Sequence, residues 1–131
     1  MSLNRNDLIK QMNEASGELL REKGYVCFVD ILLRIGKLTK ENHEAWLYRK
    51  VPYLERVIQV NLMKVNYMLR TFAKNAIKGG LRASTTAYMS RGKGPRTSLR
   101  FSKSGDSNIE EAYSTHYLKP KSTDGESRSL T

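Results

Sequence analysis

Residues 52–78, PYLERVIQVNLMKVNYMLRTFAKNAIK, contain the strongest periodic pattern in this chain. Pro52 suits the first turn of a helix, and the Gly pair that follows Lys78 suits its end. At about 100° per residue, the apolar side chains form one broad stripe. They are Leu54, Val57, Ile58, Leu62, Val65, Met68, Leu69, Phe72 and Ala76. The pattern predicts one long amphipathic helix whose apolar stripe lies in the core.

The opposite side of the same predicted helix is basic. The residues that fall within about 120° of one another there are Arg56, Lys64, Arg70, Lys74 and Lys78. Val60, Met63 and Tyr67 share this side, so it is not a purely charged exterior.

The basic bias extends well beyond this helix. Residues 56–105 contain no Asp or Glu, and the whole chain carries a net charge of +10 at pH 7. The other basic residues of the segment are Arg82, Arg91, Lys93, Arg96, Arg100 and Lys103. A local field this positive attracts polyanions and raises their rate of encounter. Nucleic acid is therefore the leading candidate partner, and a solvated surface that only aids solubility is the alternative.

Three shorter helices are predicted before the long one. They cover residues 7–23, 29–35 and 40–50. Their expected N-caps and stops are Asn6 or Asp7, Gly24, Gly36 and Thr39.

After the long helix, the hydrophobic period changes from helical to alternating. Residues 82–90 and 96–103 each alternate, and the tip between them, Arg91-Gly92-Lys93-Gly94-Pro95, has the composition of a turn. We therefore expect a β-hairpin with one apolar face and one basic, hydroxyl-rich face. Tyr88 lies on the basic face, either as a base-stacking group or as a half-buried packing residue. The tip resembles a wing, in which glycines allow close approach of a basic side chain to a groove.

One more short helix is predicted near the C-terminus. Ser107 and Glu110 are spaced as a capping box, and Tyr113 and Tyr117 are expected to pack inward. The last residues, 119–131, are rich in Ser and charge, so we expect a disordered tail. The predicted fold class is α+β, mainly α, with winged-helix-like features. Residues 1–118 are expected to form a single globular domain.

The apolar segments of the chain predict a cytoplasmic protein without membrane contact. The first ten residues lack the apolar stretch of a signal peptide. The longest apolar stretch, residues 25–35, contains Asp30 and Arg34 and is too short to span a bilayer. Cys27 lies within this stretch and is expected to be a buried thiol.

Two further segments carry weaker signals for phosphate or DNA. Ser102-Lys103-Ser104-Gly105 runs into the last predicted helix, where backbone amides and two hydroxyls suit a phosphate. An ordinary capped loop is the alternative for this segment. Residues 29–50 have the lengths of a helix-turn-helix, but Glu41 and Glu44 would face phosphates if the second helix entered a groove.

Catalytic and metal-binding patterns are poor. His43 and His116 are the only histidines, and neither has further ligands at metal-binding spacing. Glu110 and Glu111 are adjacent, so they point to different faces of a helix. We predict no enzyme activity, no metal site and no cofactor.

Two short motifs resemble segments of small uncharacterised bacterial proteins. They are Val51-Pro52-Tyr53-Leu54-Glu55 and Leu99-Arg100-Phe101-Ser102-Lys103-Ser104-Gly105. The resemblance covers residues 24–118. It implies a bacterial or mobile-element origin, and it implies no activity.

The function that we predict is non-catalytic binding of nucleic acid through its phosphate backbone. The basic side of the long helix and the basic face and tip of the hairpin would supply the contacts. DNA is preferred to RNA as the expected polymer because of the wing-like tip. The alternative is a protein-interaction or homodimerisation module that uses Val60, Met63 and Tyr67 as an exposed apolar strip.

Overall fold

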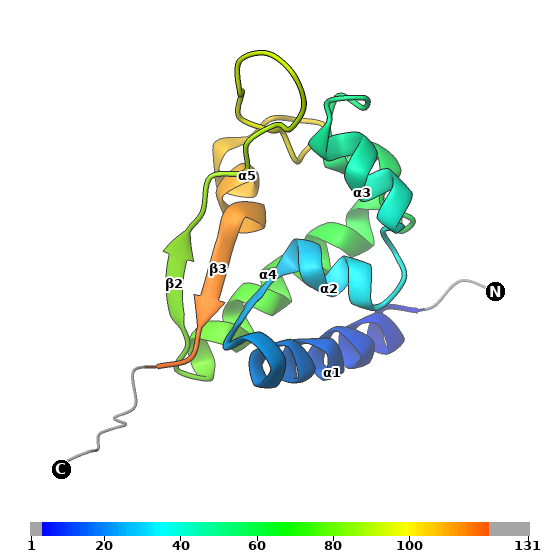
Figure 1. Ribbon diagram of the computed structural model, residues 1–131. Helices are drawn as coiled ribbons and strands as arrows, with labels where there is room; N and C mark the ends of the chain where they lie inside the picture. The colour runs from blue at the N-terminus through cyan, green and yellow to red at the C-terminus, as the bar shows by residue number, and fades with distance from the viewer. Residues whose placement is uncertain (1–3, 121–131) are drawn as a thin grey trace, which may run out of the picture.

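Helices pack beside a small sheet in an arrangement that confirms the predicted class, α+β and mainly α (Figure 1). The computed structural model describes residues 4–120. Within them the elements are α1 (Arg5–Lys23), β1 (Tyr25–Cys27), α2 (Phe28–Arg34), α3 (Lys40–Leu47), the 3-10 helix η1 (Leu54–Val57), α4 (Leu62–Lys78), β2 (Arg82–Thr85), α5 (Ser107–Ser114) and β3 (Thr115–Leu118). In Figure 1, α1 lies along the base, and the sheet stands to the left with α5 at its upper end.

The long helix begins ten residues later than its pattern predicts. α4 starts at Leu62, and the side chain of Asn61 caps it by accepting a hydrogen bond from the N–H of Lys64 at 2.9 Å. Residues 52–61 instead contain η1 followed by irregular backbone, in which Ile58 and Asn61 are extended. Three β-branched residues at positions 57–60 lower the helix propensity there. The apolar stripe itself is confirmed from Val65 onward, as its buried members are Val65, Met68, Leu69, Phe72 and Ala76.

The three helices before α4 confirm their predicted ranges to within a turn. Gly24 ends α1 in the left-handed region with φ 81°, and the Thr39 hydroxyl caps α3. The N-cap of α1 is Asn4, upstream of the two expected candidates. α3 ends at Leu47, short of the expected residue 50.

The predicted β-hairpin is largely wrong. β2 pairs with β3 rather than with residues 96–103, and β3 is the central strand of an antiparallel sheet with the order β1-β3-β2. All of β2 is exposed, including Ala83 and Thr85, which the alternation predicts to face inward. One bridge, Met89 with Ser98, remains of the hairpin.

The strand that replaces the hairpin partner is β3, which the sequence predicts as the end of the last helix. Residues 115–118 alternate between buried and half-buried positions. Tyr117 packs edge-on against Phe72 of α4, with ring centroids 5.2 Å apart. Tyr117 therefore packs inward as expected, but from a strand. Four residues are too few for periodicity to separate a strand from a helix.

The segment that follows α1 and the C-terminal part of the described chain meet in the sheet. Val26 pairs with Tyr117, and the N–H of Lys119 donates to the carbonyl of Gly24 at 3.1 Å. Lys119, just beyond β3, is therefore still bound to the body of the protein, although the predicted tail begins there. Residues 121–131, on which the rest of that prediction falls, lie outside the described residues.

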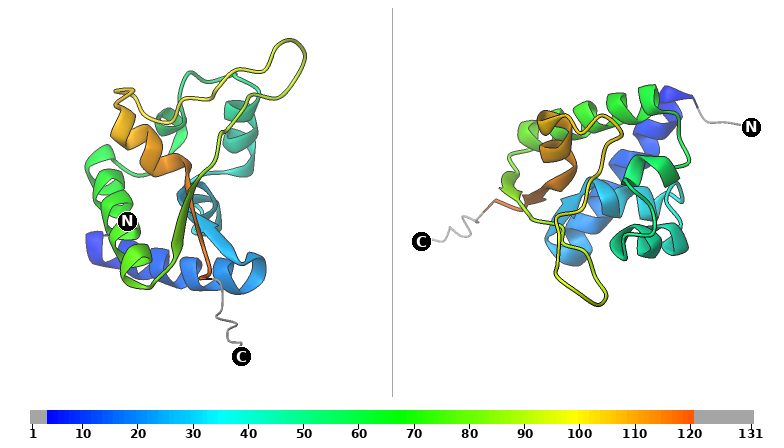
Figure 2. Two further views of the ribbon diagram at one scale, coloured as in Figure 1. Left: turned by 90° about the vertical axis from the view of Figure 1, so that its left-hand side faces the viewer. Right: turned by 90° about the horizontal axis from the view of Figure 1, so that it is seen from above.

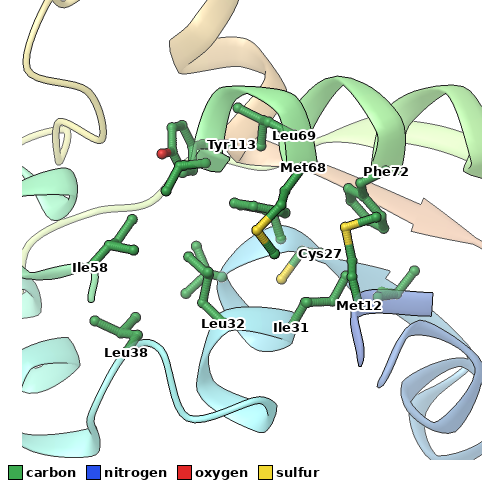
Figure 3. Close-up of a cluster of buried hydrophobic side chains, with 14 of the residues drawn as sticks. Met12, Cys27, Ile31, Leu32, Leu38, Ile58, Met68, Leu69, Phe72 and Tyr113 are labelled. Carbon is green, nitrogen blue, oxygen red and sulfur yellow. The ribbon is translucent and has the colours of Figure 1, made fainter. Parts of the chain in front are cut away.

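Buried side chains of α1, α2 and α4 meet in the core (Figure 3). Cys27 lies among them with 1% of its surface exposed, close to Met12 and Met68 in Figure 3. Burial raises the pKa of the Cys27 thiol to about 11. Its predicted role as a buried thiol is confirmed. In the part of the chain that is described, no helix has both the length and the apolar character needed to cross a bilayer.

Candidate nucleic-acid interface

Residues 86–106, which we call the basic loop, connect β2 to α5 and project from the body beside the end of α3 (Figure 1, Figure 2). The N–H of Arg91 donates to the carbonyl of Leu47, the last residue of α3, at 2.8 Å. The indole Nε1 of Trp46 donates to the carbonyl of Arg100 at 2.7 Å. The loop is therefore attached to α3 through both of its limbs.

Aromatic packing supports the same attachment. Trp46 is 1% exposed, and its ring lies 5.8 Å from that of Tyr88 and 5.1 Å from that of Phe101. Phe101 in turn stacks on Tyr113 of α5 at 5.2 Å. α3 and α5 thus hold the base of the loop around one aromatic cluster.

The carboxylate of Glu110 binds the backbone of the loop. It accepts hydrogen bonds from the N–H of Phe101 at 2.9 Å and from the N–H of Ser102 at 2.6 Å. The predicted role of Glu110 in a capping box with Ser107 is therefore wrong, because Asp106 caps α5 instead. The capping box does not form because the Glu110 carboxylate instead binds the backbone of the loop beside α5.

Glu55, on η1, also binds the backbone of the loop through its carboxylate. Its carboxylate accepts hydrogen bonds from the N–H of Lys103 at 2.9 Å and from the hydroxyl of Tyr113 at 2.8 Å. Burial, followed by the neighbouring Glu55 carboxylate, raises the pKa of Tyr113. Glu55 and Glu110 thus use the amides of Ser102 and Lys103, which the sequence offers as a phosphate site. The observed segment 102–105 is closer to the alternative, a loop satisfied by the protein itself.

The tip of the basic loop carries the exposed predicted cations. Arg91, Lys93 and Arg96 are all exposed there. Gly92 and Gly94, between them, have φ values of 102° and 93°. Glycine is favoured at such angles because it has no Cβ. These turns place three cations outward within six residues.

Three other predicted contacts lie near the base of the loop. Arg56 on η1 and Lys103 are exposed. Arg100 is also exposed, but its guanidinium donates to the carbonyls of Ser102 and Lys103 and lies 5.6 Å from the centre of the Tyr53 ring. Arg100 therefore shapes the loop, which the sequence pattern did not indicate.

The remaining predicted cations form a second group. Lys74 and Lys78 are exposed along α4, and Arg82 follows at the start of β2. Arg70 is exposed beside α5, whereas Lys64 is half-buried at the first turn of α4. In Figure 1, β2 leads from the end of α4, near Lys78 and Arg82, up to the basic loop. The merged surface predicted from a hairpin beside the long helix lacks its second strand, because β2 pairs with β3 instead.

Tyr88 is a half-buried packing residue, the second of the two roles that the sequence allows. It is half-buried, and its hydroxyl lies 2.9 Å from Nε2 of His116 and 3.4 Å from Sγ of Cys27. Exposure still alternates over residues 86–90, but the face predicted to be basic and exposed, which holds Tyr88 and Ser90, is the face that packs inward.

Three residues after α3 adjoin the basic loop, and the charge pattern of residues 56–105 does not indicate them. Tyr48, Arg49 and Lys50 are exposed, and Arg49 Nη1 donates to the Thr97 hydroxyl at 3.4 Å. They precede the acid-free segment, so a search confined to that segment misses them. The signal that could identify them is an aromatic residue followed by two adjacent cations.

The carboxylates near the basic loop differ in their surroundings. Glu55 and Glu110 point inward at the loop backbone, whereas Glu41 and Glu44 are exposed on α3. Within residues 4–120, the ion pairs are those of Lys23 with Asp30 and of Arg34 with Glu18 and Glu22. All of them join α1 to α2, away from the basic loop in Figure 1.

Residues 4–120 contain no group of three or more His, Cys, Asp or Glu placed to hold a metal ion. Comparison of the chain with protein families, with curated proteins and with solved structures finds no match. The proposals below therefore depend on the geometry alone.

The contact between His116 and Tyr88 makes a pH dependence of stability testable. Burial lowers the pKa of His116, and burial likewise lowers that of His43. The unfolded chain then binds protons at higher pH than the folded chain does. Stability is therefore fully present above about pH 6.5, the ordinary pKa of His, and falls as the pH drops through that value.

Replacing His116 by Gln, which does not titrate, is expected to reduce this loss. Urea unfolding of both proteins between pH 7.5 and pH 5 measures it. The remaining slope should decrease further in a His43→Gln, His116→Gln double variant. Identical pH slopes for the wild type and His116→Gln would contradict the prediction.

Proposed function

We propose that this protein binds nucleic acid without catalysis, through the basic loop and the adjoining end of α3. The observation that carries the proposal is the position of five exposed cations around one projecting loop. They are Arg49, Lys50, Arg91, Lys93 and Arg96. Such side chains neutralise phosphates and release counterions, which gives affinity with little sequence information.

The positions of the nearest carboxylates support this end of the molecule. Glu55 and Glu110 hydrogen-bond to backbone N–H groups at the base of the loop, so they stabilise its shape. Their charges are turned away from the tip. A loop that is fixed before binding loses less conformational entropy when it binds.

The observed loop gives no reason to prefer DNA to RNA. The preference for DNA depended on a wing formed by a regular hairpin, whereas within residues 86–100 the two limbs pair only near residues 88–90 and 97–99, through the bridge of Met89 with Ser98 and the hydrogen bonds beside it. The proposal therefore names nucleic acid without choosing the sugar.

Binding to labelled single-stranded DNA, single-stranded RNA and duplex DNA across a salt series tests the proposal. Five phosphate contacts predict a slope of log affinity against log salt of about −3.5 for single strands, at about 0.7 per contact. Fluorescence anisotropy measures it. Absence of binding to all three polymers at low salt would contradict the proposal.

The second candidate function is association with another protein chain through the start of α4. Met63 is 83% exposed and Leu62 is 37% exposed, and these values favour an apolar contact there. The other two residues of the predicted strip are different, because Val60 packs against the core and Tyr67 lies under the guanidinium of Arg5. The apolar strip is therefore smaller than the sequence suggests.

A further inference from the structure

Tyr48 is the exposed aromatic residue of the proposed interface. It follows α3 directly and is 47% exposed, whereas Trp46 and Phe101 beside it are buried. Tyr88, the predicted stacking group, has its hydroxyl bound inside the protein. We infer that Tyr48 is a stacking platform for an unpaired base, so the nucleic acid bound at this end is single-stranded. The inference rests on the proposed function and names its substrate class.

The backbone around Tyr48 is held in place. The N–H of Tyr48 donates to the carbonyl of Glu44 at 3.0 Å, and the N–H of Lys50 donates to the carbonyl of Ala45 at 2.7 Å. Arg49, between them, has φ 61° and is the non-glycine residue with positive φ within the described chain. That conformation costs free energy for a residue with a Cβ and is often found at functional sites. At this position Arg49 stands where Gly is usual, and its side chain reaches Thr97 of the basic loop.

The basic loop also touches the Tyr48 ring. A Cβ added to Gly92 would lie 3.2 Å from Cδ1 of Tyr48, so the backbone of Gly92 lies against the ring edge. Arg91 and Lys93 flank this glycine and are exposed. A base stacked on Tyr48 therefore has two cations on the loop side of its platform, where the adjoining phosphates of a strand would lie.

The pocket next to Tyr48 has a lining that suits a base better than a phosphate. It has a volume of about 420 Å³ and is lined by Glu41, Glu44, Ala45, Tyr48 and Lys50. Its two carboxylates repel phosphate, but they can accept hydrogen bonds from the amino group of a base. The pocket therefore suits a base edge, and the phosphates lie on the loop side. Bases inside a duplex are stacked on one another and cannot present their faces to a protein ring, whereas bases of a single strand can.

Substitution of Tyr48 in the full chain tests the inference. Binding to a mixed-sequence single strand of DNA, and to its duplex, is measured for the wild type, Tyr48→Ala and Tyr48→Trp. Stacking of one base predicts a loss of roughly 5- to 150-fold on the single strand for Tyr48→Ala. The salt slope should be unchanged, and Tyr48→Trp should retain the affinity. Ile77→Ala is the matched control, because Ile77 is a 59% exposed apolar residue on α4.

The outcomes separate this inference from the proposed function. Salt-dependent binding of the wild type with unchanged affinity of Tyr48→Ala would overturn the stacking role alone. An equal loss on single strand and duplex would also overturn it. Absence of wild-type binding to the single strand, to the duplex and to single-stranded RNA would overturn both. Photo-crosslinking of the wild type to a single strand with 5-iodocytosine provides a readout that needs no variant: an adduct on Tyr48 supports the inference, and adducts elsewhere only would oppose it.

Discussion

Changing Arg91, Lys93 and Arg96 together to Glu is expected to weaken binding to single-stranded nucleic acid by about 100-fold or more at 0.1 M salt. Each phosphate contact adds about 0.7 to the slope of log affinity against log salt, so loss of three contacts lowers that slope by about 2. At 0.1 M salt this corresponds to about 100-fold, before the repulsion from three new carboxylates is added. All three residues are exposed, so stability should change little.

The matched control is the triple change of Lys74, Lys78 and Arg82 to Glu. It alters the net charge by the same amount at the other basic group, on α4 and β2. If the basic loop is the contact, this control should retain most of the affinity and most of the salt slope. An equal loss in both triple variants would show that binding follows net charge. A loss in the control alone would assign the contact to α4 and β2.

The helical part of the fold could be predicted because it depends on local signals. The buried stripe of α4 and the stops at Gly24 and after Lys78 follow from spacing and backbone conformation within a few residues. The start of α4 was the exception. Pro52 is compatible with a helix start, but Asn61 and the β-branched residues before it compete, and the competing signal determines the outcome.

The sheet could not be predicted because its pairing is non-local. β2 has an alternating pattern that fits either residues 96–103 or β3 as a partner. The choice depends on the packing of Tyr117 against Phe72, which brings residues 115–118 beside α4. No pattern within either strand contains that information.

The candidate site was predicted in its charges but not in its roles. The exposed cations of the loop tip lie where the composition indicates. The sequence does not show that Arg100 binds loop carbonyls, or that Glu55 crosses from η1 to the N–H of Lys103. These are contacts between residues distant in sequence or within an irregular loop. They decide which cations face solvent, and a count of charges cannot decide that.

Replacing Trp46 by Ala is expected to destabilise the protein by about 3–5 kcal/mol, the usual cost of removing a large buried aromatic side chain. Trp46 is 1% exposed, and it packs against Phe101 and Tyr88 on the two limbs of the basic loop. The substitution also removes the donor to the carbonyl of Arg100. Urea unfolding followed by circular dichroism measures the change. Because the same side chain holds the loop beside α3, the affinity for single strands should fall as well.

Two further variants separate the packing of Trp46 from its hydrogen bond. Trp46→Phe retains an aromatic ring and removes only the indole donor, while the N–H of Leu54 still donates to the Arg100 carbonyl at 3.2 Å, so a loss of about 0.5–1.5 kcal/mol is expected from the hydrogen bond. Tyr48→Ala, two positions along and 47% exposed, should change the free energy of unfolding by no more than about 0.5 kcal/mol. A loss below about 1 kcal/mol for Trp46→Ala would contradict the role of Trp46 as the anchor of the loop. Trp46→Ala could instead lose much stability while its folded fraction binds nucleic acid with wild-type affinity. That result would place the nucleic-acid contact outside the basic loop, because loss of the loop's anchor would then have no effect on binding.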